Sequence, residues 1–156
     1  MFEKLENRAI IEYSIKTKSA LHIGGHQVIS PADVDNPIIK DSDETPIVPG
    51  SSLKGVLRSE MERLLKGLDI RVCNSNNAKE MCPADKECPV CILFGGKELA
   101  ASLRIRDATA NSKRTIIRDG VAIDRKTRKA VDGGKYDVEA VPKGTEFKGS
   151  IIIENL

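Results

Sequence analysis

The sequence Pro49-Gly50-Ser51-Ser52-Leu53-Lys54-Gly55-Val56-Leu57-Arg58 joins a glycine turn to the start of an amphipathic helix. Ser51 or Ser52 can cap the first turn, and Lys54 and Arg58 are spaced i,i+4 on one helix face. The N-terminus of a helix carries about half a positive charge and unpaired N–H groups, so it favours an anion. The stretch therefore predicts a phosphate-binding site, with an ordinary capped helix and solvated cations as the alternative.

The pattern of apolar residues predicts one long helix over residues 51–67, ended by Gly67. Its apolar stripe consists of Leu53, Leu57, Met61, Leu64 and Leu65. A strand is predicted before it at 8–17, and extended segments are predicted after it at 102–107, 115–118, 120–124, 136–141 and 146–154. This order matches the first three quarters of a ferredoxin-like α+β fold, βαββαβ.

The last quarter of that fold has no candidate in the sequence. No second helix and no fourth strand follow the apolar run Ile151-Ile152-Ile153. We therefore expect one domain over residues 1–156 whose C-terminal part is absent, either because another chain completes it or because a longer protein was cut. Residues 69–93, which lack a regular period, are expected to form an inserted loop.

Length and hydropathy limit the cellular class of the protein. The 156 residues contain no apolar run of membrane-spanning length, and the charged start lacks the regions of a signal peptide. We expect a cytoplasmic protein with no membrane partner.

Positive charge is concentrated in one part of the chain. The formal net charge is only +2, yet residues 104–129 carry nine cations and three acids, a net of +6. Arg125 to Lys135, with its Asp-Gly-Gly turn sequence, is expected to form an exposed hairpin arm that includes Arg125, Lys126, Arg128 and Lys129. Such an uneven distribution of charge favours a polyanionic partner, with a solvated basic edge strand as the alternative.

Aromatic side chains are scarce. The chain has no Trp, two Tyr and three Phe, so it offers few platforms on which bases can stack. If it binds RNA, we expect contacts to the sugar-phosphate backbone, weak sequence preference and strong salt dependence.

The four cysteines are spaced C-x8-C-x5-C-x2-C at Cys73, Cys82, Cys88 and Cys91. Four thiolates in an intracellular loop favour a structural zinc, and Cys88-Pro89-Val90-Cys91 is typical of a zinc knuckle. Disulfides and free thiols are the alternatives. A zinc with four sulfur ligands has no open position, so it would hold the loop in place without catalysing a reaction.

Taken in order, these motifs resemble the RAMP superfamily of type III CRISPR effector complexes, in particular the repeating backbone subunit of the Csm and Cmr type. The resemblance covers nearly the whole chain. Its segments are 21–25, 35–41, 46–58, 88–95, 103–108, 120–127 and 136–145. The chain departs from the family pattern in lacking a C-terminal glycine-rich loop and terminal strand.

The resemblance implies a modified RNA-recognition fold that assembles along a CRISPR RNA with copies of itself and other subunits. It also implies a thumb-like β-hairpin and, in Csm-type members, metal-dependent cleavage of the target RNA by one aspartate, here Asp35. Asp33 is the nearest rival, and Asp35 before Asn36-Pro37 is also a good turn former. Mg²⁺ or another divalent cation is expected to bind only with RNA, because a single carboxylate is a weak site.

The remaining site residues follow from the same chemistry. His22 is expected either to act as a second acid-base group or to pack at the end of a strand. Ser51, Ser52, Lys54 and Arg58 are expected to hold guide phosphates, and Arg125 and Lys126 to attract RNA at longer range.

The sequence thus predicts a subunit that binds CRISPR RNA and is a metal-dependent endoribonuclease. The alternatives are a non-catalytic scaffold that only binds and measures the guide, a zinc-stapled RNA-binding module unrelated to CRISPR, and a guide-processing endonuclease.

Overall fold

The computed structural model describes residues 4–25, 34–74, 77, 80–83 and 86–155. Contacts between Cα atoms divide the chain into two compact units. Unit 1 comprises Met1–Tyr13, Pro49–Ala108 and Gly149–Leu156, and unit 2 comprises Ser14–Val48 and Thr109–Lys148.

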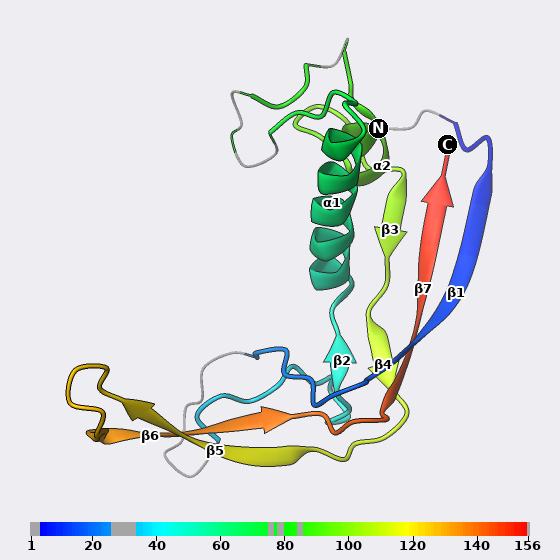
Figure 1. Ribbon diagram of the computed structural model, residues 1–156. Coiled ribbons are helices and arrows are strands. Elements are labelled where there is room, and N and C mark those ends of the chain that lie inside the picture. The colour runs from blue at the N-terminus through cyan, green and yellow to red at the C-terminus, as the bar shows by residue number, and fades with distance from the viewer. Residues whose placement is uncertain (1–3, 26–33, 75–76, 78–79, 84–85, 156) are drawn as a thin grey trace. The chain divides into compact units, whose positions relative to one another are not determined.

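The described residues form two helices and seven strands (Figure 1). In chain order these are β1 (Arg8–Lys16), β2 (Ile47–Val48), α1 (Gly50–Gly67), α2 (Pro89–Phe94), β3 (Leu103–Ile105), β4 (Ala108–Ala110), β5 (Ile116–Ile123), β6 (Ala130–Ala140) and β7 (Glu146–Glu154). One sheet has the order β1-β7-β4-β2, with β3 also paired to β7, and β5 pairs with β6 in a second sheet. The pairs of β3 and β4 with β7, and of β5 with β6, are antiparallel.

Three of the predicted elements are confirmed almost to the residue. The first strand ends at Lys16, the helix spans 50–67, and the last strand spans 146–154. The α+β class is confirmed as well, whereas the ferredoxin-like arrangement and the absence of its C-terminal part stay predictions. Neither described helix has the length and apolar character that a bilayer crossing requires.

The core of unit 1 is built around the cysteine-rich segment. Cys82, Cys88, Cys91, Val90, Phe94 and Leu103 form a buried cluster. Met61 and Leu65 of α1 and Ile151 and Ile153 of β7 pack against it. The expectation that 69–93 is wholly irregular is wrong, because α2 begins at Pro89, a residue whose fixed φ suits the first turn of a helix.

The apolar stripe of α1 is only partly covered. Leu57 and Leu64 remain exposed, at 38% and 56%. They border an open groove of about 420 Å³ within unit 1. Its other apolar lining residues are Met61, Leu93, Phe94 and Leu103.

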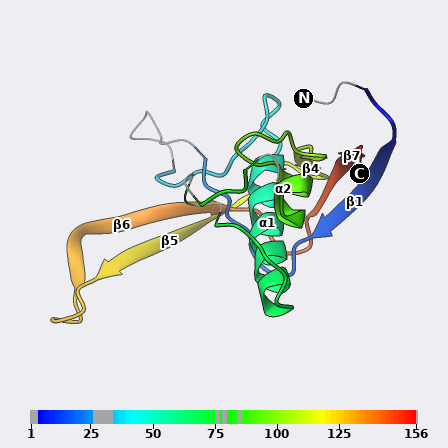
Figure 2. The same cartoon turned by 90° about the horizontal axis from the view of Figure 1, so that it is seen from above.

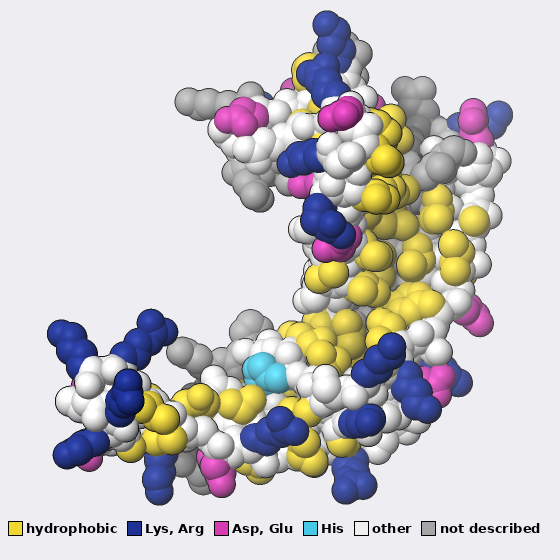
Figure 3. Space-filling model, viewed as in Figure 1, with side chains coloured by type: hydrophobic (Ala, Val, Ile, Leu, Met, Phe, Trp, Pro, Cys, Tyr) yellow, Lys and Arg dark blue, Asp and Glu magenta, His cyan; other side chains and the backbone are white. Residues whose placement is uncertain are grey.

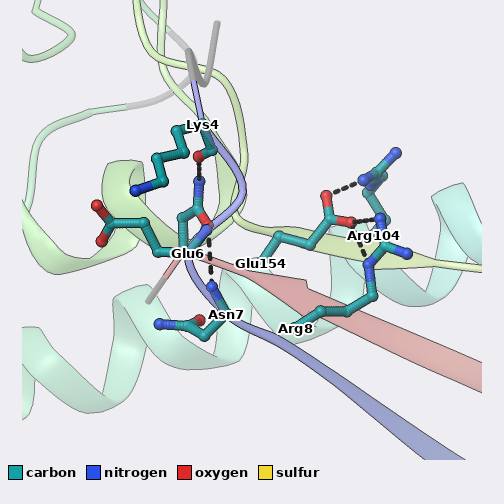
Figure 4. A network of polar contacts seen from close by, with 7 residues as sticks. Lys4, Glu6, Asn7, Arg8, Arg104 and Glu154 are labelled. Atoms are coloured by element: carbon teal, nitrogen blue, oxygen red, sulfur yellow. Dashed lines mark hydrogen bonds and ion pairs between the residues drawn. The ribbon is translucent and has the colours of Figure 1, made fainter.

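A polar network in unit 1 joins β1, β3 and β7 (Figure 4). The buried carboxylate of Glu154 accepts hydrogen bonds from Arg8 Nε at 2.7 Å and from the guanidinium of Arg104. The next residue, Asn155, accepts from the N–H of Glu6 at 2.8 Å and donates to the carbonyl of Lys4 at 2.7 Å. An unpaired buried carboxylate would destabilise the fold, and the two arginines compensate the charge of Glu154.

Unit 2 contains the predicted hairpin, formed by β5 and β6, which lie side by side in Figures 1 and 2. The turn is not at Asp132-Gly133-Gly134 as expected, but at 124–129, where Asp124 Oδ1 accepts the N–H groups of Lys126 and Thr127. Instead, the two glycines lie within β6, where the pairing register shifts between Val121 and Ile123. Gly133 has φ +71°, which a glycine adopts without strain.

Candidate nucleic-acid interface

The N-terminus of α1 does not have the predicted serine cap. Neither Ser51 nor Ser52 caps the helix, and the N–H of Gly50 instead donates to Asp107 Oδ1 at 2.7 Å. A Cβ on Gly50 would lie 2.1 Å from the carbonyl oxygen of Ile105, so the close approach requires glycine. A carboxylate of the protein itself therefore already interacts with the positive end of this helix.

Lys54 and Arg58 share one face of α1, as the i,i+4 spacing predicts. Burial and then the charge of Arg58 lower the pKa of Lys54, which indicates that the two cations are close. Arg58 is held by Glu62 Oε1, 3.1 Å from its Nε, and by the carbonyl of Gly95, 3.0 Å from its Nη1. Its Nη2 is buried and has no hydrogen-bond partner among the described residues.

The two candidate catalytic residues are brought to the same edge of β6. Asp35 Oδ2 accepts the N–H of Asp137 at 2.9 Å, and His22 Nδ1 lies 2.7 Å from the carbonyl oxygen of Glu139. These backbone groups lie on the edge that does not face β5, two residues or about 7 Å apart along the strand. Both side chains are exposed, so the packed alternative for His22 is wrong. The rival Asp33 lies outside the described residues.

The hydrogen bond of His22 has a chemical consequence. A carbonyl oxygen can only accept, so Nδ1 carries the proton and Nε2 of the neutral ring is left as the basic atom. Residue 24 lies beside that nitrogen and is a glycine, on which a Cβ would be 3.4 Å from Nε2.

Two further carboxylates lie near Asp35. Asp119 of β5 is directly opposite Asp137 of β6. Burial, and then the neighbouring carboxylates of Asp119 and Asp35, raise the pKa of Asp137. Like charges placed opposite each other repel, which makes this end of the hairpin receptive to positive charge.

Glu139, two residues further along β6, has a different role. It is 5% exposed, its Oε1 is 2.8 Å from Lys40 Nζ, and its Oε2 accepts the N–H of Ile38. Burial acts to raise its pKa, but Lys40, the Thr115 hydroxyl and the N–H of Ile38 together lower it. Glu139 therefore stays ionised and anchors the 38–40 segment on β6. No local pattern indicated this long-range pair.

The hairpin arm is basic and exposed, as expected. Arg118, Arg125, Lys126, Arg128, Lys129 and Lys135 are all exposed on it. Figure 3 shows dark blue Lys and Arg side chains standing out around the end of the arm, with yellow apolar side chains between them. The apolar set was not anticipated: Ile117, Val121, Ile123, Val131 and Tyr136 are between 43% and 61% exposed.

The four cysteines converge in unit 1. Their Sγ atoms all lie within 4.8 Å of one another, and Cys73 Sγ is 3.3 Å from Cys91 Sγ and 3.8 Å from Cys88 Sγ. A tetrahedral zinc with four sulfur ligands spaces its sulfurs about 3.8 Å apart. The arrangement therefore fits a structural zinc, and all four residues are free thiols.

The thiols also differ in acidity. Burial acts to raise the pKa of Cys88, but the N–H groups of Cys73 and Cys91 outweigh it and lower the pKa to about 6. Burial raises the pKa of Cys82, and burial together with the neighbouring thiols raises that of Cys91. A cluster of buried thiols with one favoured thiolate is prepared to accept a cation.

Comparison with known proteins places these features in a family. A model of the RAMP superfamily matches residues 14–156. The chain is 28% identical over 161 residues to a protein of Methanocaldococcus jannaschii named CRISPR system Cms endoribonuclease Csm3, covering 95% of this chain and 63% of the relative. It is 30% identical over 179 residues to the Csm3 of Methanothermobacter thermautotrophicus, covering 96% of this chain and 69% of that relative.

Proposed function

Because this chain belongs to the RAMP superfamily, we propose that it is an RNA-binding subunit of a type III CRISPR complex of the Csm type and that it cleaves target RNA. The observation that carries the proposal is the similarity to two endoribonucleases named Csm3 along nearly all of this chain. Its partners are then CRISPR RNA, target RNA, copies of itself and other subunits of the complex.

RNA is held mainly through its phosphates. The exposed cations of the arm, among them Arg125 and Lys126, attract the polyanion, and Lys54 and Arg58 with Ser51 and Ser52 contact guide phosphates. Since Asp107 already occupies the N–H of Gly50, the cationic side chains and not the first N–H group are the phosphate ligands there.

Cleavage uses the 2′-hydroxyl of the RNA as nucleophile. This reaction needs a base near the 2′-oxygen, in-line geometry at phosphorus and positive charge near the developing negative charge. Asp35 would accept the proton of the 2′-hydroxyl or hold a divalent cation that supplies positive charge for the reaction, and His22 Nε2 would serve as the second acid-base group. Asp119 and Asp137 strengthen the negative field that attracts the cation.

The four-cysteine cluster holds zinc in this proposal. Cys73, Cys82, Cys88 and Cys91 supply all four ligands, so the metal has no position for substrate. Zinc would neutralise the thiolates and fix α2 against α1, which is a structural contribution.

The test is the substitution Asp35→Asn. An asparagine keeps an oxygen that accepts the N–H of Asp137, so the loop stays attached while the charge and the basicity are lost. Target RNA is mixed with the protein, guide RNA, partner subunits and Mg²⁺, and cleavage is followed on a gel. We expect the rate to fall by about 100-fold or more while RNA affinity stays within about twofold.

The exposed carboxylate of Asp43 supplies the matched control. Asp43→Asn should cleave like the wild type. Full cleavage by Asp35→Asn would refute the assignment of the catalytic residue. RNA binding without cleavage by the wild type would establish the scaffold alternative, and failure to assemble with other subunits would establish a module unrelated to CRISPR.

A further inference from the structure

Tyr136 differs from every other described aromatic residue. Phe94 and Phe147 are buried at 6% and 1% exposure, and Tyr13 is half-buried, whereas Tyr136 is 43% exposed on the hairpin arm. Tyrosine combines an apolar ring with a polar hydroxyl, so an exposed tyrosine is suited to contact a partner. In a chain with so few aromatic side chains, its position needs an explanation.

The ring of Tyr136 is supported from one side by the backbone of β5. Gly120 is its direct cross-strand partner, and a Cβ on Gly120 would lie 2.5 Å from ring atoms Cε2 and Cζ and 2.9 Å from the hydroxyl oxygen. The ring therefore rests across the space that a side chain at position 120 would fill. A ring fixed in this way loses little conformational entropy when a planar group is placed against it.

The neighbours of the ring on the same face leave it accessible and add a positive charge. Toward the turn lie two small residues, Ala122 and Gly134, so close that a Cβ on Gly134 would be 3.1 Å from the Cβ of Ala122. On the other side, Arg118 is the diagonal cross-strand neighbour of Tyr136. Arg118 is exposed and forms no ion pair with any described residue.

We infer that Tyr136 is a stacking platform for one unpaired nucleobase of bound RNA, and that Arg118 contacts the phosphate next to that base. The inference rests on the RNA binding proposed above. Every base has a π-face, so stacking on a tyrosine is tolerant of sequence, and a guanidinium beside the ring supplies the charge that the phosphate needs. The contrasting explanation is that the ring only covers Gly120 and stabilises the hairpin.

The experiment measures affinity for a single-stranded RNA of mixed sequence by fluorescence anisotropy at several salt concentrations, with the full chain. Tyr136→Leu removes the ring and keeps an apolar side chain, and we expect binding to weaken about tenfold. The salt dependence of RNA binding by Tyr136→Leu should equal that of the wild type, because stacking releases no counterions. Arg118→Gln should instead reduce the slope of log affinity against log salt by about 1.

Two further variants separate stacking from a loss of hairpin structure. Tyr136→Phe retains the ring and should bind like the wild type. Ile117→Ala removes an apolar side chain that is more exposed than Tyr136, at 59%, on the opposite face of the same hairpin, and should have little effect. If Tyr136→Leu disturbs the circular dichroism spectrum, Gly120→Ala is used, which displaces the ring and keeps its chemistry.

A spectroscopic readout reports the stacking itself. The chain has no Trp and only two Tyr, so in a Tyr13→Phe background the emission of tyrosine comes from Tyr136 alone. Quenching on addition of RNA supports the inference. Unchanged emission on addition of RNA, or wild-type affinity of Tyr136→Leu, would overturn the stacking inference but not the proposed RNA binding. If the wild type itself does not bind RNA, the proposed function is overturned as well.

Discussion

At the scale of single residues, Glu139 links the candidate site to the stability of unit 2. Its carboxylate is buried, and it binds Lys40 and the N–H of Ile38 in the segment next to Asp35 and Asn36. The backbone N–H of Glu139 in turn donates to the carbonyl of Asn36 at 2.9 Å. One residue thus fixes the loop both through its side chain and through its backbone.

We predict that Glu139→Gln lowers the free energy of unfolding by about 1–3 kcal/mol near neutral pH, because Lys40 loses its buried counterion. The pKa of Glu139 is lowered in the folded protein, so its contribution to stability is fully present above the pKa of an unfolded glutamate, about 4.5, and is lost progressively as the pH falls from there through the lower pKa of the folded state. Urea unfolding at pH 7 and pH 3.5 measures both effects.

Glu44 provides the control for that prediction. Its carboxylate is 3.7 Å from the same Lys40 Nζ, but it is 79% exposed, so Glu44→Gln should change stability by less than about 0.5 kcal/mol. Equal losses for the two variants would contradict the importance of the buried pair.

At the scale of elements, the start of α1 depends on a backbone contact that only glycine allows. Gly50 lies against the carbonyl of Ile105 at the end of β3, and its N–H is bound by Asp107, which follows that strand. Helix and strand are thereby joined at their ends within unit 1. The contact lies 57 residues away in sequence, so no local pattern could have indicated it.

Gly50→Ala and Gly55→Ala should therefore have opposite effects. At position 50 the added Cβ meets a backbone oxygen, and we expect a loss of at least about 2 kcal/mol in stability. At position 55, in the helix interior, nothing lies within 4 Å, and alanine should stabilise by about 0.5–1 kcal/mol. Thermal unfolding of both variants measures these changes in stability. If Gly50→Ala is as stable as the wild type, α1 is free to shift away from Ile105.

At the scale of the whole molecule, the core of unit 1 depends on the cysteine cluster. Three of its six buried members are cysteines, and residues from α1, β3 and β7 pack on them. Without a metal, these thiols would repel once ionised and contribute little packing volume. A metal at this position would therefore stabilise several elements together.

Removal of zinc should lower the melting temperature by about 10 °C or more. The protein as purified is analysed for metal content, and we expect one zinc per chain. After chelation, hydrogen exchange should become faster in α1 and α2 and remain slow in the paired segments of β5 and β6. Added zinc should restore protection and Mg²⁺ should not. A chain without metal whose cysteines are oxidised would support the disulfide alternative instead.

The sequence by itself determined the local elements and the family. Periodicity fixed β1, α1 and β7, because apolar spacing and glycine punctuation act over a few residues. The motifs from 21–25 to 136–145 predicted membership of the RAMP superfamily, which the match over residues 14–156 confirmed. The cysteine spacing predicted a cluster whose four sulfur atoms do converge.

Only the tertiary structure decided what these residues contact. It replaced the serine cap of α1 with Asp107, moved the hairpin turn to 124–129, and attached Asp35 and His22 to one edge of β6. It also supported the ring of Tyr136 on Gly120. Each of these contacts joins residues far apart in the chain or depends on strand register, and register is set by pairing between strands, which a local pattern does not encode.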